Sequence, residues 1–202
     1  RLMQAAGELR VRPHAKSHKC PDIAKRQIEL GAVGICCQKL SEAMVFAQAG
    51  ITDILLTNEV VGSVKLAYLA DLAQQIRLGV LVDDVHHVQA LAQAMAEKPQ
   101  PLDVYIEVEV GGQRCGVSPQ SVVHLATMIE ANRQLRFAGL HCYHGAAQHY
   151  REPAQRASAI GQACKLVRQV VMDLEQAGIH VPCITGAGTG TFLHEQASGL
   201  YT

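Results

Sequence analysis

Two kinds of hydrophobic pattern alternate along the chain. Short runs of aliphatic and β-branched residues predict strands, and longer stretches with apolar residues every three or four positions predict helices. The predicted strands are Leu9–Pro13, Val33–Cys37, Asp53–Thr57, Leu78–Val82, Val104–Val110, Phe137–Tyr143 and Cys183–Gly186. The predicted helices are Pro21–Leu30, Ser41–Ala49, Gly62–Ile76, Val85–Glu97, Pro119–Asn132 and Pro153–Ala177.

This alternation predicts an α/β fold with a parallel sheet. Right-handed crossovers leave two arrangements, an open doubly wound sheet or a closed barrel. No G-x-G-x-x-G motif follows the first predicted strand, and the repeats are short and regular, so we favour a TIM-type (β/α)8 barrel with one strand lacking. No linker or low-complexity tract divides the chain, so residues 1–202 are predicted to form one incomplete barrel domain.

Composition and charge narrow the function classes. Hydrophobic residues make up 49% and charged residues 18% of the chain, which excludes a disordered protein. Lys+Arg 18 balances Asp+Glu 18 and aromatics are 4%, so we expect no nucleic-acid partner. No apolar run approaches the ~20 residues of a membrane span, so we expect no membrane partner. The odd count of seven cysteines favours a reduced, cytoplasmic protein over a disulfide framework.

Chemically reactive residues follow the predicted strands. The carboxyl ends of parallel strands meet at one edge, where barrel enzymes place their sites. Lysine, arginine, histidine and tyrosine gather there with a Gly/Thr loop, which predicts a site for an anion and a carbonyl group. The segments are Arg12–Lys19, Gln38, Thr57–Glu59, Asp83–Asp84, Gly111–Gly116, His141–His149 and Thr185–Thr191.

Lys16 is the first candidate for chemistry. A lysine inside a barrel mouth can be desolvated, and nearby histidine and arginine would lower its pKa further. The resulting neutral amine can form a Schiff base with an aldehyde. A surface lysine in a basic loop, or a simple phosphate contact, remains the alternative interpretation.

The segment Thr185–Thr191 predicts a phosphate-binding loop. Glycines let backbone N–H groups approach an anion, threonine hydroxyls donate further bonds, and a following helix adds its dipole. The alternative is a flexible loop. The segment is not a P-loop, because no lysine follows its last glycine. Arg114 could bind a ring nitrogen or a carboxylate, or remain a solvated turn residue.

Three histidines follow the sixth predicted strand, namely His141, His144 and His149. Their spacing fits no standard zinc pattern, so a general base or a substrate contact is the better functional interpretation. Tyr143 could flank an aromatic cofactor or pack in the core.

Some polar and thiol residues are expected to have structural roles only. Cys36 and Cys37 are adjacent in a strand, so their side chains should point to opposite faces. His86 and His87 are expected at the surface without a partner, and Arg77 on a solvated helix face.

Six ordered motifs, taken together, resemble one enzyme family. The motifs are Arg12–Lys19, Gly34–Lys39, Thr57–Gly62, Val110–Val117, Tyr143–His149 and Thr185–Thr191. They are similar to the fold-type III pyridoxal-phosphate enzymes of the D-threonine aldolase and D-serine dehydratase group, which share the barrel of the alanine racemase family. The doubled cysteine before Gln38 and the Tyr143–His149 motif are more similar to the aldolase branch, which includes D-3-hydroxyaspartate aldolases.

The resemblance implies a cofactor and roles for the candidate residues. Lys16 would hold pyridoxal 5'-phosphate as a Schiff base, and Arg114 would face the pyridine nitrogen and keep it unprotonated. His149 would remove the proton of the β-hydroxyl group, so that the Cα–Cβ bond breaks to give glycine and an aldehyde. The implied cofactor contacts are Lys16, Gln38, Arg114, Tyr143, Thr185, Gly188, Thr189 and Gly190.

Family members carry parts that the resemblance places outside residues 1–202. These are an N-terminal strand and helix, an eighth barrel strand, a second phosphate-binding Gly-Ser turn and a C-terminal β-domain. That domain supplies a His-x-Cys pair for a divalent metal, manganese or magnesium, so we expect no metal ligand in this chain. We therefore expect a barrel truncated at both ends, with little activity alone, and a homodimer at full length.

The predicted function is metal-assisted cleavage of D-β-hydroxy-α-amino acids of the D-threonine type. A pyridoxal-phosphate-dependent D-serine or D-3-hydroxyaspartate dehydratase is the alternative enzyme, and racemase action is less favoured. A non-catalytic barrel that binds the same cofactor is the alternative outside enzyme classes.

Overall fold

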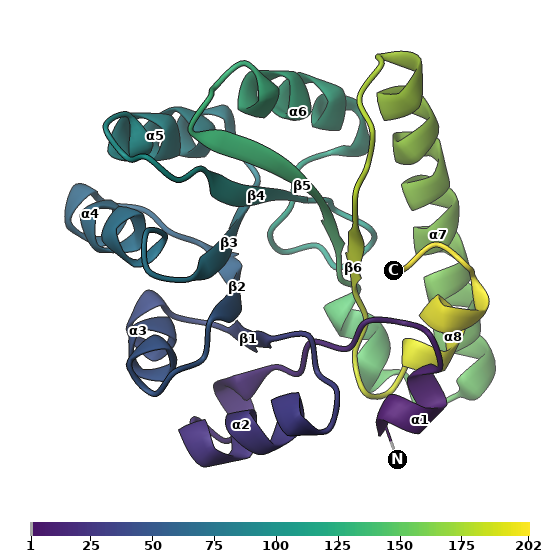
Figure 1. Ribbon diagram of the computed structural model, residues 1–202. Helices are drawn as coiled ribbons and strands as arrows, with labels where there is room; N and C mark the ends of the chain where they lie inside the picture. The colour runs from purple at the N-terminus through teal and green to yellow at the C-terminus, as the bar shows by residue number, and fades with distance from the viewer. Residues whose placement is uncertain (1) are drawn as a thin grey trace.

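The computed structural model describes residues 2–202 and shows one curved, six-stranded parallel sheet with strands in sequence order (Figure 1). The strands are β1 (Ile35–Cys37), β2 (Asp53–Glu59), β3 (Arg77–Val82), β4 (Leu102–Glu107), β5 (Leu135–Cys142) and β6 (Ile184–Gly186). Each strand pairs in parallel with the next, so all six carboxyl ends lie along one edge. The α/β class and the incomplete barrel are confirmed.

Helices α2 to α7 cover the outer face of this sheet (Figure 1). The α-helices are α1 (Leu2–Ala6), α2 (Pro21–Glu29), α3 (Leu40–Gln48), α4 (Ser63–Leu72), α5 (Val85–Met95), α6 (Val122–Glu130), α7 (Pro153–Gln176) and α8 (Phe192–Ala197). The short 3₁₀ turns are η1 (Ala15–Ser17), η2 (Pro119–Ser121) and η3 (Gly145–His149). Across residues 2–202, no helix combines the length and the apolar character that crossing a bilayer requires.

Apolar side chains fill both faces of the sheet. A large core lies between the sheet and the helices and includes Phe46, Leu56 and Ile106. A second, smaller cluster lines the inner face of the curve and consists of Cys36, Leu55, Leu81, Tyr105 and Ala138, with Cys183 packed against it. Cys36 belongs to the inner cluster and Cys37 to the outer core, which confirms that these neighbours point to opposite faces.

The first predicted strand, Leu9–Pro13, is wrong: this segment is not part of the six-stranded sheet. It still runs beside β1, because the N–H of Val33 donates to the carbonyl of Val11 and that of Cys36 to the carbonyl of Pro13. Proline has no N–H to donate, so a regular ladder cannot continue through position 13. A single parallel bridge between His14 and Cys36 is what remains.

An ion-pair network ties the strands together at their amino ends. Arg12 pairs with Asp53 at 2.6 Å, while Arg77 and Arg136 approach the buried Asp103 at 3.2 and 2.5 Å. Arg77 therefore opens β3 and is ion-paired, which corrects its expected place on a solvated helix. The network lies opposite the carboxyl edge, so the polar residues there remain available for chemistry.

Two glycines give a matched test of this packing. Gly139 in β5 has φ +138°, and a Cβ there would overlap the backbone of Cys183, so Gly139→Ala should destabilise by at least about 2 kcal/mol. Gly161 lies in α7, and a Cβ added there would meet no atom within 4 Å, so Gly161→Ala should stabilise by roughly 0.5–1 kcal/mol. Urea unfolding measures both, and equal effects at the two positions would contradict the register of β5 against the β6 segment.

Candidate active site

Polar residues form a layer directly above the inner apolar cluster. Side chains two positions apart in a regular strand share a face. For four residues that form the inner cluster or pack against it, the residue two positions later is polar. The pairs are Cys36 and Gln38, Leu81 and Asp83, Tyr105 and Glu107, and Cys183 and Thr185. The carboxyl edge of the sheet is therefore a polar mouth above an apolar floor.

Lys16 lies at this mouth in η1, the turn that follows the segment beside β1. His14 holds the turn, because its Nδ1 accepts from the backbone N–H of Lys16 at 3.2 Å and its Nε2 lies 2.9 Å from the hydroxyl of Thr57. Burial, with the charge of Lys16, lowers the pKa of His14 to about 4. Lys16 is exposed among residues 2–202, as the alternative interpretation of a surface lysine has it, so its role in chemistry stays a prediction.

His141 lies at the centre of the mouth and is 6% exposed. Its Cα is paired with Glu107 on one side and Thr185 on the other. Burial lowers the pKa of His141 to about 3, and the positive charges of Arg114 and Lys16 act in the same direction. These two cations and the start of the Thr185–Thr191 loop therefore surround one neutral imidazole, whose Nδ1 has no partner among residues 2–202.

Arg114 reaches the mouth from the loop after β4. Its guanidinium lies 5.1 Å from the centroid of the Tyr143 ring, and its Nη2 donates to Glu107 Oε1 at 3.3 Å. Burial and the neighbouring carboxyl group of Glu59 raise the pKa of Glu107, while Arg114 opposes that rise. Sequence analysis missed Glu107, although a charged residue within the apolar run Val104–Val110 was a signal of a functional strand end.

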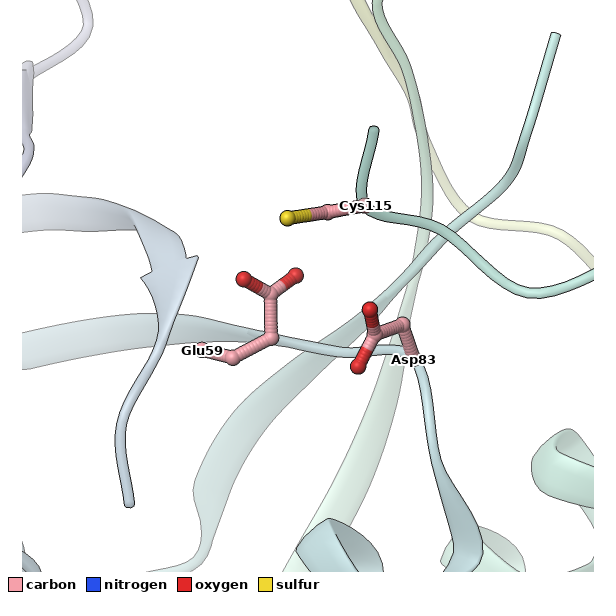
Figure 2. Close-up of side chains that lie close together, drawn as sticks. All are labelled: Glu59, Asp83 and Cys115. Atoms are coloured by element: carbon pink, nitrogen blue, oxygen red, sulfur yellow. The ribbon is translucent and has the colours of Figure 1, made fainter. Parts of the chain in front are cut away.

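Two carboxylates and a thiol gather beside this loop, as Figure 2 shows for Glu59, Asp83 and Cys115. Their oxygen and sulfur atoms lie within 4.8 Å of one another. Asp83 already accepts from the backbone N–H of Gly116 at 3.2 Å and lies 3.1 Å from His87 Nδ1. Asp83 therefore holds the loop that carries Arg114. His87 lies beside Asp83, although its Nδ1 makes no hydrogen bond within residues 2–202.

The loop after β6 offers three unused backbone donors. The N–H groups of Ala187, Gly188 and Thr189 make no hydrogen bond with any residue in the range 2–202. Ala187 has φ +76°, and the chain then turns into α8 through bonds from Thr191 and Phe192 to the carbonyl of Gly188. Successive free N–H groups in such a turn form an anion-binding nest. This loop fits a phosphate group.

The remaining candidates have distinct surroundings. Gln38 is fixed through its backbone, since its N–H donates to Glu42 and its carbonyl accepts from Asn58. His144 is buried and accepts from Ala147 N at 3.3 Å, so it caps η3, which argues against a role as a base. His149 ends η3 with an exposed side chain and makes no hydrogen bond or ion pair with the part of the chain described, so its role remains a prediction.

The comparisons with known proteins agree with one another on the family of this chain. The model of the alanine racemase N-terminal domain family matches residues 1–201. The chain is 47% identical to a D-threonine aldolase from an Arthrobacter species over 100% of this chain and 54% of that protein. It is 38% identical to a 3-hydroxy-D-aspartate aldolase of Paracoccus denitrificans over 96% of this chain and 51% of that protein.

A solved structure has nearly the same backbone. The D-threonine aldolase from Filomicrobium marinum superposes with a TM-score of 0.97 and 45% identity, covering 99% of this chain and 55% of that one. The chain thus spans about half the length of the curated relatives it matches.

The buried His141 predicts a specific dependence of stability on pH. Its pKa falls from an ordinary 6.5 to about 3 on folding, so the unfolded chain binds a proton below pH 6.5 that the folded chain does not. Folding stability is therefore lost as pH falls. The free energy of unfolding of the wild type relative to His141→Gln should drop by up to about 1.4 kcal/mol per pH unit between pH 6 and 4.

Denaturant unfolding at several pH values measures this slope. His124→Gln, at an exposed position on α6, should keep the wild-type slope. Parallel curves for the wild type and His141→Gln would show that His141 is solvated.

Proposed function

Because the chain belongs to the family of alanine racemase N-terminal domains, we propose that it is the cofactor-binding barrel of a pyridoxal 5'-phosphate-dependent aldolase. The proposed substrates are D-β-hydroxy-α-amino acids of the D-threonine type, cleaved to glycine and an aldehyde. The observation that carries the proposal is the placement of Lys16, Arg114 and the free N–H groups of residues 187–189 at one edge of the sheet, around His141.

The residues at this edge match the chemical groups of the cofactor. The phosphate would be bound by the nest of residues 187–189, with Thr185 and Gly190 beside it, and the aldehyde by the exposed amine of Lys16. When bound, pyridoxal phosphate supplies an aldehyde that condenses with amines and a ring that withdraws electrons from the substrate Cα. Gln38 and Tyr143 are the further contacts that we propose.

Arg114 is proposed to face the pyridine nitrogen. A guanidinium stays charged at all physiological pH values, so it donates a hydrogen bond and does not protonate that nitrogen. The hydrogen bond to Glu107 and the ring of Tyr143 both contact this group, which orients it before any ligand binds.

His149 is the base that we propose for the β-hydroxyl proton. Its exposed side chain is open to a substrate that enters the mouth. We further propose that a divalent metal, manganese or magnesium, assists at that hydroxyl through ligands outside this chain, and that the working enzyme is a homodimer.

Substitution of Lys16 tests the proposed cofactor attachment most directly. Lys16→Ala should abolish the visible absorbance of the bound cofactor and lower D-threonine cleavage at least about 10³-fold, because it removes the amine proposed to hold the aldehyde. Lys19→Ala is the matched control, since Lys19 is exposed nearby and pairs with Glu42. It should keep both the absorbance and the activity. The absorbance and the activity are both measured on the protein as its host produces it, in the presence of Mn²⁺.

The products separate the proposal from its alternatives. Glycine and acetaldehyde from D-threonine would support it, and a keto acid with ammonia from D-serine or D-3-hydroxyaspartate would show a dehydratase instead. Cofactor binding without turnover of any D-amino acid would show a non-catalytic barrel. Unchanged absorbance in Lys16→Ala would refute the role of the lysine.

A further inference from the structure

Gln148 connects η3 to the loop after β6. Its Oε1 accepts from the backbone N–H of Gly190 at 2.8 Å, and its Nε2 donates to the hydroxyl of Thr191 at 2.7 Å. One amide thus uses its acceptor and a donor on two successive residues of a loop 42 and 43 positions away. Such paired bonds fix the orientation of the side chain as well as its distance.

The contact is also sterically close. A Cβ built on Gly188 would lie 2.5 Å from both Cδ and Oε1 of Gln148, so a larger residue at position 188 would displace this amide from its two hydrogen bonds. Thr191 extends this hydrogen-bond network to α8, since its hydroxyl donates to Glu195 Oε1 at 2.7 Å. Thr191 and Glu195 are 1% and 2% exposed. A continuous chain of side-chain hydrogen bonds therefore runs from η3 through the loop to α8.

These hydrogen bonds determine which backbone N–H groups of the loop stay free. Gly190 N–H is taken by Gln148, and the N–H groups of Thr191 and Phe192 are taken by the carbonyl of Gly188. The donors that stay free are the N–H groups of residues 187–189, three successive positions of the loop. A loop fixed in its binding shape loses less conformational entropy when an anion arrives.

We propose that Gln148 is a positioning residue for the phosphate of the cofactor. It holds the 187–190 loop in the shape that accepts the phosphate, and it does so without touching that group. This inference rests on the proposed function and adds to it a determinant of phosphate affinity outside the nest.

The test compares two probes that differ only in the phosphate. The cofactor-free protein is titrated with pyridoxal 5'-phosphate and with pyridoxal, and the dissociation constants are measured by absorbance. Gln148→Met keeps the length and packing of the side chain but removes both hydrogen bonds. It should weaken pyridoxal 5'-phosphate roughly 10-fold to 30-fold and change pyridoxal by less than about 2-fold.

A second variant and a matched control complete the design. Gln148→Glu can still accept from Gly190 but adds a negative charge beside the phosphate, so its loss for pyridoxal 5'-phosphate should be at least as large. Gln169→Met removes a glutamine that donates to Asp173 on the outer helix α7. It should leave both dissociation constants unchanged.

The outcomes separate this inference from the proposed function. Equal weakening of both probes would show that Gln148 only supports the fold and would overturn the inference, as would unchanged binding of both. Either result leaves the proposed function intact if the wild type binds pyridoxal 5'-phosphate. A wild type that binds neither probe would overturn both.

Discussion

The parallel sheet imposes the constraint on which the rest of the structure depends. Six strands in sequence order run in one direction, so every segment that leaves a strand at its carboxyl end arrives at the same edge. Lys16, Arg114 and the loop after β6 are far apart in the sequence, yet they meet there around His141. The apolar inner cluster below them closes the floor of the mouth, and the ion-pair network holds the opposite edge.

Buried and partly buried polar groups organise this mouth before any ligand is present. Glu107 and Tyr143 orient Arg114, and Asp83 holds the loop that carries it. His14 holds the turn of Lys16. Three of these anchors lie at or just after the ends of β3, β4 and β5, and His14 bridges to β1, so the sheet as well as the loops sets the geometry of the reactive groups.

Much of the arrangement could be predicted from the sequence because it follows from periodicity. The two-residue period predicted the opposite directions of Cys36 and Cys37, and the strand ends predicted where Lys16 and Arg114 would gather. The strand Leu9–Pro13 was wrong because an apolar run does not show whether Pro13 interrupts a ladder. The exposure of Lys16 and the partners of Glu107 and Gln148 depend on tertiary contacts, some over 40 positions apart, which a single sequence does not record.

The central claim is that the amine of Lys16 and the phosphate loop bind the two ends of one small molecule. Reduction of the protein with sodium borohydride after incubation with pyridoxal 5'-phosphate fixes the adduct for peptide mapping by mass spectrometry. The account predicts one phosphopyridoxyl group per chain, on Lys16. Modification of another lysine instead, or no stable adduct, would contradict it.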